Sequence, residues 1–317
     1  MSTMPKFNYA FNIVEGTESW IKGTERGCIE GTFEGKGSVS ISLTGGRSEI
    51  DADFSAFAGT MTACGEGFHL NSNVTDMSKT RLVLGDGAKV QHVRRGGDAA
   101  EAITTKVGSV ESETGNCSLG NGVDSYEVGY SGKDTKYSGR LTAKNVTKKG
   151  GGVWILDGSG SSAHVTVSEG TIQFNNAATG IYTSGIVEAA GNGIIAGTGC
   201  LGTVNVRKGG VLSVGNNGTC GTLKVQGNVT MFTGSTLMIR IGANQWGATS
   251  SDKFQFTGTR VAHSNDTILI SVEPGRLLKA GDKFTVFTGT AKHEGKYTLK
   301  TVSGEQTIVW DLSLIHI

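Results

Sequence analysis

Apolar and polar residues alternate in short runs along this chain, and glycines separate one run from the next. Val204-Asn-Val-Arg-Lys-Gly209-Gly-Val-Leu-Ser-Val214 and Val229-Thr-Met-Phe-Thr-Gly234-Ser-Thr-Leu-Met-Ile239 share the same apolar positions and the same glycine position. Alternation with a period of two gives a strand one inward face, and glycine supplies the positive φ of a tight corner. The pattern predicts a unit of two short strands joined at a glycine.

Related copies extend this unit to both halves of the chain. Leu82–Val90 opens with the same pattern, and Val165–Phe174 is a shorter copy. One unit cannot bury its apolar face alone, whereas stacked copies form a continuous core. We therefore predict an all-β parallel β-helix (β-solenoid) with about 22 residues in a coil and about 14 coils. Turns at these intervals also suit a β-sandwich, but Asn-Gly and Asp-Gly hairpin turns are scarce.

Composition supports strands and turns and excludes several classes of partner. The 317 residues include 50 glycines, and glycine disfavours a helix by about 1 kcal/mol relative to alanine. A net charge of +1 gives no reason to expect a nucleic acid or an acidic membrane surface as a partner. The nearest basic clusters, Lys148–Lys149 and Arg94–Arg95, are interpreted as solvated turns. Because no apolar run approaches about 18 residues, we expect no membrane insertion by this segment.

One stretch carries a family signature. Val146-Thr-Lys-Lys-Gly-Gly-Gly-Val-Trp-Ile-Leu156 is followed by Val165-Thr-Val-Ser-Glu-Gly-Thr-Ile-Gln-Phe174. This arrangement closely resembles the passenger-associated β-strand repeat of autotransporter proteins, which reads Leu-Thr-Lys-x-Gly-x-Gly-x-Trp-x-Leu and then Val-x-x-Gly-x-Leu-x-Val. Stretches that resemble the terminal coils of such passengers are Gly202–Asn217, Gly221–Val225, Gly234–Leu237, Ser251–Phe254, Leu278–Phe284 and Val309–Asp311.

The resemblance implies a right-handed parallel β-helix at the surface of a Gram-negative-type bacterium or outside the cell. It divides the chain into divergent β-helix coils (1–120), passenger-associated repeats with terminal coils (121–313), and a tail (314–317) that resembles a translated sequencing adapter. We interpret the tail as non-native and the chain as a segment of a longer protein, with neighbouring domains.

A glycine motif raises the question of a cofactor. Gly197-Thr-Gly-Cys-Leu-Gly202 has the G-x-G-x-x-G spacing of dinucleotide-binding proteins. That site requires a helix after the motif and an acidic residue about 20 positions later. Instead, Thr203–Val206 alternates as a strand, and Thr219 and its neighbours are not acidic. We interpret these glycines as a solenoid corner and expect no nucleotide and no other cofactor.

Two stretches carry acidic side chains of interest. Gly120-Asn-Gly-Val-Asp-Ser-Tyr126 partly matches a calcium-binding β-roll repeat, but Leu119 replaces its first glycine and no tandem copy follows, which favours a polar turn. Asp51 and Asp53 share one face of a predicted strand, with Arg47 nearby. Polysaccharide hydrolases need two carboxylates at a defined separation. Since no second acidic pair occurs one coil away, we interpret Asp51 and Asp53 as an exposed charged ridge.

The histidines, cysteines and tryptophans form no recognisable motif. The histidines, which lack H-E-x-x-H or paired spacing, are His69, His92, His164, His263, His293 and His316. The cysteines, which are too far apart for a C-x-x-C motif, are Cys28, Cys64, Cys117, Cys200 and Cys220. We therefore assign no metal ligands and expect no disulfide framework. Trp154 alternates with Leu156 and Trp310 with Ile308, which indicates packing.

These observations lead to one hypothesis and one alternative. We expect a non-catalytic structural or adhesive β-helix segment, either a passenger stalk or an accessory module, with a glycan or host-surface ligand as the candidate partner. We assign no catalytic, cofactor-binding or metal-binding residue. The alternative is part of a polysaccharide lyase or glycoside hydrolase of β-helix fold, although fold analogy alone does not establish a function.

Overall fold

The protein is described from a computed structural model. The described residues are 5–45, 47–93, 103–162, 164–176, 182, 185–215, 220–242, 251–273, 278–279 and 281–302. Every named element in these ranges is a β-strand, and no helix there is long and apolar enough to cross a membrane. The chain forms two compact units, residues 1–165 and 166–317. The tail at 314–317 lies outside the described residues, and the division predicted at residue 120 stays a prediction.

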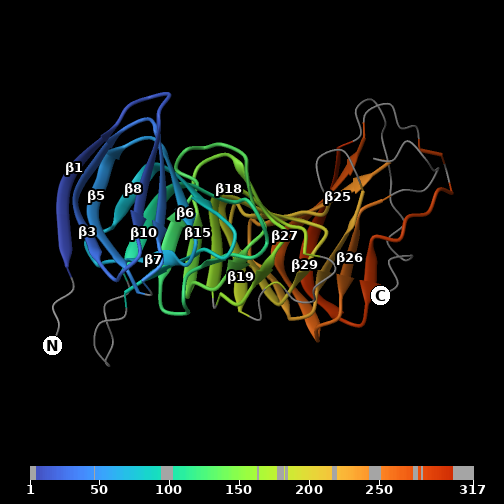
Figure 1. Cartoon of the computed structure of the whole chain (residues 1–317). Coiled ribbons are helices and arrows are strands. Elements are labelled where there is room, and N and C mark those ends of the chain that lie inside the picture. The colour runs from blue at the N-terminus through green and yellow to red at the C-terminus, as the bar shows by residue number, and fades with distance from the viewer. Residues whose placement is uncertain are drawn as a thin grey trace. The chain divides into compact units, whose positions relative to one another are not determined.

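Unit 1 contains two main stacks of parallel strands whose members alternate along the chain (Figure 1). The first stack is, in order of pairing, β1 (Lys6–Ile13), β3 (Cys28–Gly35), β5 (Glu49–Phe57), β7 (Gly67–Leu70), β9 (Lys89–His92), β11 (Ser118–Leu119), β14 (Arg140–Leu141) and β17 (Ser159–Gly160). The second stack is β2 (Glu18–Gly23), β4 (Ser38–Leu43), β6 (Thr60–Cys64), β8 (Asp76–Leu84), β10 (Thr104–Ser112), β12 (Ser125–Val128) and β15 (Asn145–Lys148). In addition, β13 (Thr135–Tyr137) pairs with β16 (Val153–Leu156). This sequential alternation is that of a parallel β-helix.

Unit 2 repeats the arrangement of stacked parallel strands. One group consists of β19 (Ile186–Gly197), β21 (Thr203–Val206), β22 (Val211–Leu212), β24 (Val229–Met231), β25 (Thr236–Ile241), β27 (Arg260–Val272) and β29 (Lys292–Val302). The other pairs β20 (Cys200–Leu201), β23 (Thr222–Val225), β26 (Lys253–Phe256) and β28 (Phe287–Gly289) in that order. The remaining strand, β18 (His164–Phe174), contains the boundary between the units.

Parallel pairing in every described strand pair confirms the predicted solenoid and rules out the β-sandwich, whose neighbouring strands run antiparallel. Among the described residues, antiparallel contacts occur as two isolated bridges, Gly197 with Gly215 and Ile241 with Ser251.

The core of unit 1 consists of side chains stacked from coil to coil. Val39, Met61, Leu82 and Val110 lie opposite one another on β4, β6, β8 and β10, and all four are fully buried. Alternation along each strand turns these residues inward, as in Ser38–Leu43, where buried and half-buried residues alternate. Parallel register then places each apolar residue on the one before it, which builds the continuous core that the repeat pattern predicted.

Aromatic rings form a second ladder at the start of the chain. The rings of Phe11, Phe33 and Phe54 stack with centroids 4.5 and 4.6 Å apart. On the outer side of β1 and β2 no described strand pairs, so Phe7, Tyr9 and Trp20 remain about half exposed. The first coil therefore buries less apolar surface than the coils that follow.

The repeat found in the sequence corresponds to the pairing in unit 2. Val204 pairs with Val229 and Leu212 with Leu237, the same alignment that the two sequence copies show. The corner glycines also stack, since the Gly209 N–H donates to the Gly234 carbonyl at 2.9 Å and both have φ near +80°. The predicted strand, glycine corner and strand are confirmed at this position.

Coil length varies along the chain. In unit 1, a hydrogen bond between neighbouring strands joins Asn71 to Glu49, 22 residues apart, which matches the predicted coil. In unit 2, the bond from Thr288 to Phe254 spans 34 residues. A single coil length of about 22 residues therefore does not hold along the chain, and unit 1 also departs from it, since the bond between Arg81 and Glu111 on β8 and β10 spans 30 residues.

The family-like stretch of unit 1 is a tightly packed corner. Trp154 is buried, as predicted, and its indole N–H donates to the Val110 carbonyl at 3.0 Å. The prediction of a solvated turn at Lys148 is wrong, because this side chain is buried and its ammonium group donates to the carbonyls of Lys149 and Gly150, both at 2.6 Å. Arg94–Arg95 and Trp310, whose roles were also predicted, lie outside the described residues.

Candidate functional site

The glycine motif at 197–202 is a corner between strands, as the sequence predicted. Strand β19 ends at Gly197 and β20 begins at Cys200. The amides of Thr198 and Gly199 both donate to the carbonyl of Phe174, at 3.0 and 2.7 Å. A phosphate-binding loop must direct such N–H groups at its ligand. Here the backbone uses them, so this corner offers no dinucleotide site.

The calcium-like stretch is also a turn, but its carboxylate points inward. Gly120 and Gly122 have positive φ and form the turn that was predicted. Asp124 is buried, and its Oδ2 accepts hydrogen bonds from the His92 amide at 2.9 Å and the Tyr126 hydroxyl at 3.2 Å. These donors hold two strands together, and this carboxylate does not face solvent as a calcium ligand of an exposed loop would.

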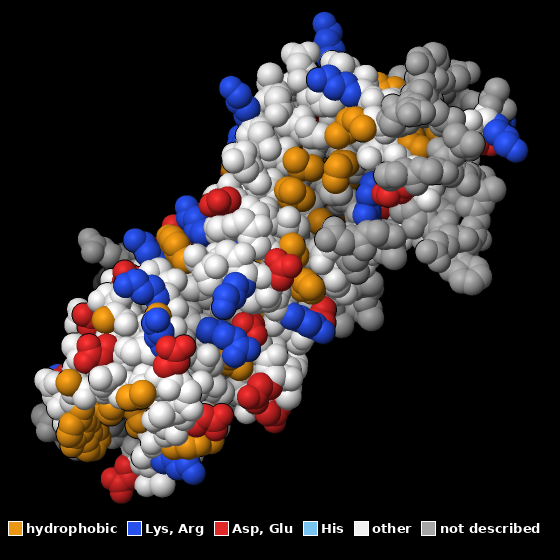
Figure 2. Space-filling view, turned by 90° about the horizontal axis from the view of Figure 1, so that it is seen from above, with side chains coloured by type: hydrophobic (Ala, Val, Ile, Leu, Met, Phe, Trp, Pro, Cys, Tyr) orange, Lys and Arg blue, Asp and Glu red, His pale blue; other side chains and the backbone are white. Residues whose placement is uncertain are grey.

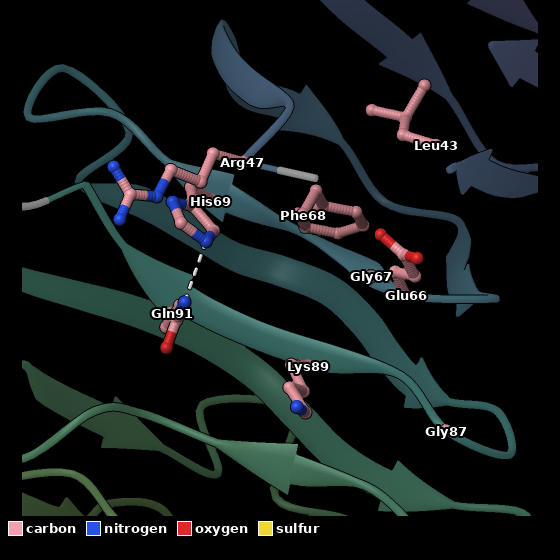
Figure 3. Close-up of a pocket in the computed structure, with 9 residues that line it drawn as sticks. All are labelled: Leu43, Arg47, Glu66, Gly67, Phe68, His69, Gly87, Lys89 and Gln91. Carbon is pink, nitrogen blue, oxygen red and sulfur yellow. Dashed lines mark hydrogen bonds between the residues drawn. The ribbon is translucent and has the colours of Figure 1, made fainter. Parts of the chain in front are cut away.

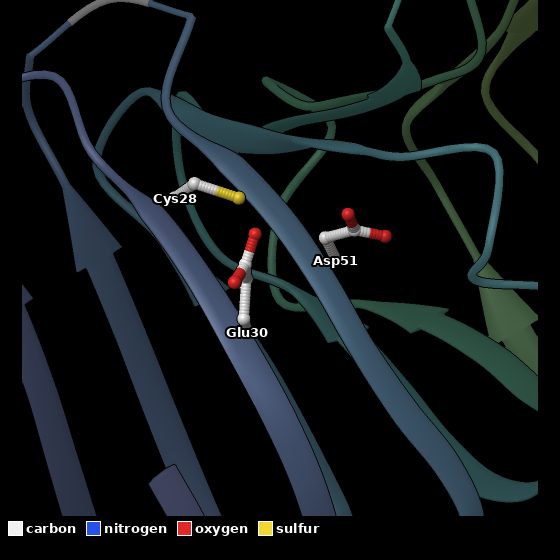
Figure 4. A group of neighbouring side chains, drawn as sticks. All are labelled: Cys28, Glu30 and Asp51. Carbon is white, nitrogen blue, oxygen red and sulfur yellow. The ribbon is translucent and has the colours of Figure 1, made fainter. Parts of the chain in front are cut away.

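A group of side chains with ligand atoms lies on the outer face of β3 and β5 (Figure 4). Asp51 and Asp53 share one face of β5, as predicted, with Asp51 half-buried and Asp53 exposed. The sequence missed Glu30, which is the register partner of Asp51 on β3. Ligand atoms of Cys28, Glu30 and Asp51 all lie within 4.8 Å of one another, and the described residues contain no other such group of three.

The neighbours of this group oppose metal binding. The Lys6 ammonium bonds to Glu30 at 2.5 Å, and the Asn73 amide donates to Asp51 at 2.9 Å. Burial, followed by the nearby charge of Glu49, raises the pKa of the Cys28 thiol to about 11. A metal ion would have to displace both a thiol proton and the Lys6 ammonium. We therefore regard the carboxylates as part of the charged ridge, now extended to β3.

Two histidines that the sequence treats as single residues meet in unit 2. His263 on β27 and His293 on β29 approach with Nε2 and Nδ1 3.2 Å apart, and the carboxylate of buried Asp266 accepts from His263 Nδ1 at 2.9 Å. Burial, and then the His263 charge, lowers the pKa of His293 to about 4. A β-bulge between Ser264 and Asp266 turns Asp266 toward the ring. Sequence spacing could not reveal this pair, because the coil joining the two strands is long.

A small pocket of about 280 Å³ lies on the outer face of β7 and β9 (Figure 3). His69 from β7 contacts Gln91 from β9, with Nε2 atoms 2.6 Å apart, and Arg47 lies beside the imidazole. Burial lowers the pKa of His69. Glu66 and Lys89 complete the charged part of the wall. The pocket thus carries both signs of charge.

A larger groove of about 680 Å³ adjoins this pocket and shares Gly87 and Lys89 with it. It lies over β9, β11, β14 and β17, where Lys89 pairs with Ser118, Ser118 with Arg140, and Arg140 with Ser159. We call it the Lys89–Arg140 groove. Its described wall contains two basic residues but no acidic residue and no aromatic ring. No sequence motif marks it, because its side chains come from four coils.

Several other charges form ion pairs between neighbouring coils. Such pairs include Arg81 with Glu111 at 2.7 Å in unit 1 and Arg207 with Glu188 at 2.8 Å in unit 2. On the face shown in Figure 2, basic and acidic side chains are mixed. All five cysteines are free thiols.

No protein-family model matches this chain, and no curated protein sequence matches it. The fold is therefore established by the strand pairing, while the family resemblance rests on the motifs quoted above.

Proposed function

We propose that the chain is a non-catalytic structural or adhesive β-helix segment of a secreted or surface-displayed bacterial protein. The observation that carries this proposal is the stacked core of each unit, in which the inward side chains of successive coils pack against one another. Some outward charges form ion pairs between neighbouring coils, such as Arg81 with Glu111 and Lys136 with Asp157. Such an array suits an extended module that presents a surface.

Packing roles for the passenger-like motifs support membership in the autotransporter passenger class. In the Lys-x-Gly-x-Gly-x-Trp stretch, Lys148 binds turn carbonyls, Gly152 lies against the backbone of Lys133, and Trp154 fills the core. In Ser251-Asp-Lys-Phe, Asp252 is buried. Its carboxylate accepts hydrogen bonds from Arg240 Nε at 2.9 Å and from the Gly221 amide at 3.2 Å. These motif residues build corners, which is the role that a repeat motif needs.

Export provides the test of this proposal. The full chain would be placed between a secretion signal and an outer-membrane translocator, and cells would be treated with an external protease. We expect the folded segment at the cell surface, detectable by antibody before protease is added. A matched variant, Val39→Asp, charges the core and should reduce display of folded protein. Retention of the folded wild-type segment inside the cell would contradict the proposal.

A polysaccharide-cleaving enzyme is the second candidate, favoured by the carboxylates of Glu30 and Asp51 on neighbouring strands. Two carboxyl groups about 5 Å apart suit a retaining glycosidase. Incubation of the purified chain with acidic and neutral polysaccharides should release no new reducing ends and no unsaturated products. Cleavage that Glu30→Gln and Asp51→Asn both abolish would replace the structural proposal with the enzyme.

A further inference from the structure

We propose that the Lys89–Arg140 groove binds an acidic polysaccharide along the axis of the β-helix. This inference rests on the adhesive form of the proposed function and names the class of ligand and the surface that receives it. Four observations carry it: two uncompensated cations, their spacing, a polar floor, and the absence of rings from the described wall.

The two cations are available to a ligand. Lys89 and Arg140 are both exposed, and neither side chain forms an ion pair or a hydrogen bond with another described residue. Elsewhere in unit 1, Arg81 and Lys136 are held by carboxylates at 2.7 and 2.6 Å. A groove with two free cations and no acidic residue in its described wall attracts anions by charge complementarity.

The spacing of these cations follows from the strand register. Lys89 on β9 and Arg140 on β14 are separated by one strand, β11, whose Ser118 is the register partner of both. Adjacent strands lie about 4.8 Å apart, so the two positions repeat at about 10 Å along the axis. An extended polysaccharide advances by roughly one strand spacing per pyranose ring. A polysaccharide with a carboxylate on every second sugar therefore has the same charge spacing as Lys89 and Arg140.

The floor between the cations can hydrogen-bond to sugar hydroxyls. Ser118 and Ser159 occupy the same ladder as Lys89 and Arg140, and Asn116 lines the side of the groove. These groups both donate and accept, which suits a polyol.

A nucleic acid fits this groove less well. Single-stranded nucleic acids are bound through aromatic platforms that stack on the bases, and the described wall provides no ring. The next pocket adds Arg47 to the basic residues, but it also adds Glu66, whose charge opposes an extended polyanion there. The site is therefore placed in the larger groove.

Binding to the purified full chain tests the inference. Hyaluronan, which has one carboxylate for every two sugars, is the probe, with dextran as the neutral polysaccharide and single-stranded DNA as the competing polyanion. The double variant K89Q/R140Q removes the groove cations. The control K224Q/K253Q removes two exposed cations from β23 and β26, outside the groove. Folding of both variants is checked by circular dichroism.

The expected result is hyaluronan binding that weakens with salt, is reduced about tenfold in K89Q/R140Q and changes less than about twofold in the control. The inference is overturned if wild type does not bind hyaluronan, if dextran or DNA binds equally well, or if both double variants weaken binding alike. These failures leave the display result untouched, so they separate the groove from the proposed function. Cleavage of hyaluronan would contradict the non-catalytic function while leaving the groove as its binding site.

Discussion

At the scale of single residues, several charged side chains serve as internal connectors, including two that the sequence pattern assigned to turns. Asp124, Lys148 and Asp252 are each buried. The two carboxylates accept from backbone amides of other segments, whereas Lys148 donates to carbonyls of its own turn. A buried polar group left without a partner costs about 1–3 kcal/mol, so each connector is tied to its local backbone. Residue type alone cannot reveal this, because the partner groups belong to other coils or to a turn conformation.

Lys148 gives the most direct test of such a connector. Lys148→Met keeps the aliphatic stem but removes the ammonium that bonds the carbonyls of Lys149 and Gly150. We expect a loss of about 1–3 kcal/mol in the free energy of unfolding, measured by urea denaturation. Lys149→Met is the matched control, since Lys149 is partly exposed and pairs with Glu127 at 3.7 Å, and it should cost less than about 1 kcal/mol. Equal losses in the two variants would argue against the buried connector.

Two histidines predict a pH dependence of stability. Burial lowers the pKa of His92 to about 4, and burial with the His263 charge does the same for His293, from an ordinary value of 6.5. Between these values the unfolded chain binds protons that the folded chain does not, so stability falls as the pH drops from 6.5 toward 4.

The measurement is urea unfolding at several pH values between 6.5 and 5, above the range in which most carboxylates titrate. Each histidine contributes a slope of up to about 1.4 kcal/mol per pH unit. His92→Leu and His293→Leu should each flatten the curve. A curve with the same slope in wild type and in both variants would contradict this assignment.

At the scale of elements, the tight corners depend on glycines that have no room for a side chain. A Cβ on Gly152 would lie 2.4 Å from the carbonyl oxygen of Lys133 in the preceding coil, whereas a Cβ on the adjacent Gly151 would have no atom within 4 Å. The passenger-like motif thus contains one glycine that is required by packing and one that is not.

This difference predicts opposite results for two neighbouring substitutions. Gly152→Ala forces the coils apart and should lower the free energy of unfolding by about 1–3 kcal/mol. Gly151→Ala should be neutral or stabilise by up to about 1 kcal/mol, because alanine restricts the unfolded chain. Thermal unfolding of the two variants beside wild type decides the matter. If the Gly152→Ala and Gly151→Ala proteins were equally stable, the backbone at this corner would accommodate a Cβ without loss of stability, and the prediction would be wrong.

The elements were the part of the fold that the sequence predicted best. Val204–Val214 and Val229–Ile239 share their apolar and glycine positions, and this alignment is also the strand register, because the corner glycines and alternating residues determine both. The variation in coil length and the His263–His293 pair could not be predicted, since contacts between coils depend on connections of variable length. The Lys89–Arg140 groove escaped for the same reason, as its residues share a ladder but no sequence interval.

At the scale of the whole molecule, a solenoid is held together by contacts between neighbouring coils. Stability is then close to a sum of coil and interface contributions, and damage to one coil stays local. The ladder of Phe11, Phe33 and Phe54 links three successive coils of unit 1, with the fully buried Phe33 in the middle. Phe7, on the first coil, is 47% exposed and makes a suitable comparison.

Phe33→Ala should therefore unfold part of the molecule before the rest. Removing a buried phenylalanine ring costs about 3–5 kcal/mol, because contacts to the rings on both sides are lost and a cavity remains. In hydrogen exchange followed by mass spectrometry, we expect lost protection in β1, β3 and β5 and unchanged protection in β26 and β28, which belong to unit 2. Phe7→Ala should leave both regions nearly as in wild type. If Phe33→Ala instead lowered protection equally in all strands, folding would be cooperative over the whole chain, and the description as a sum of neighbouring coils would be wrong.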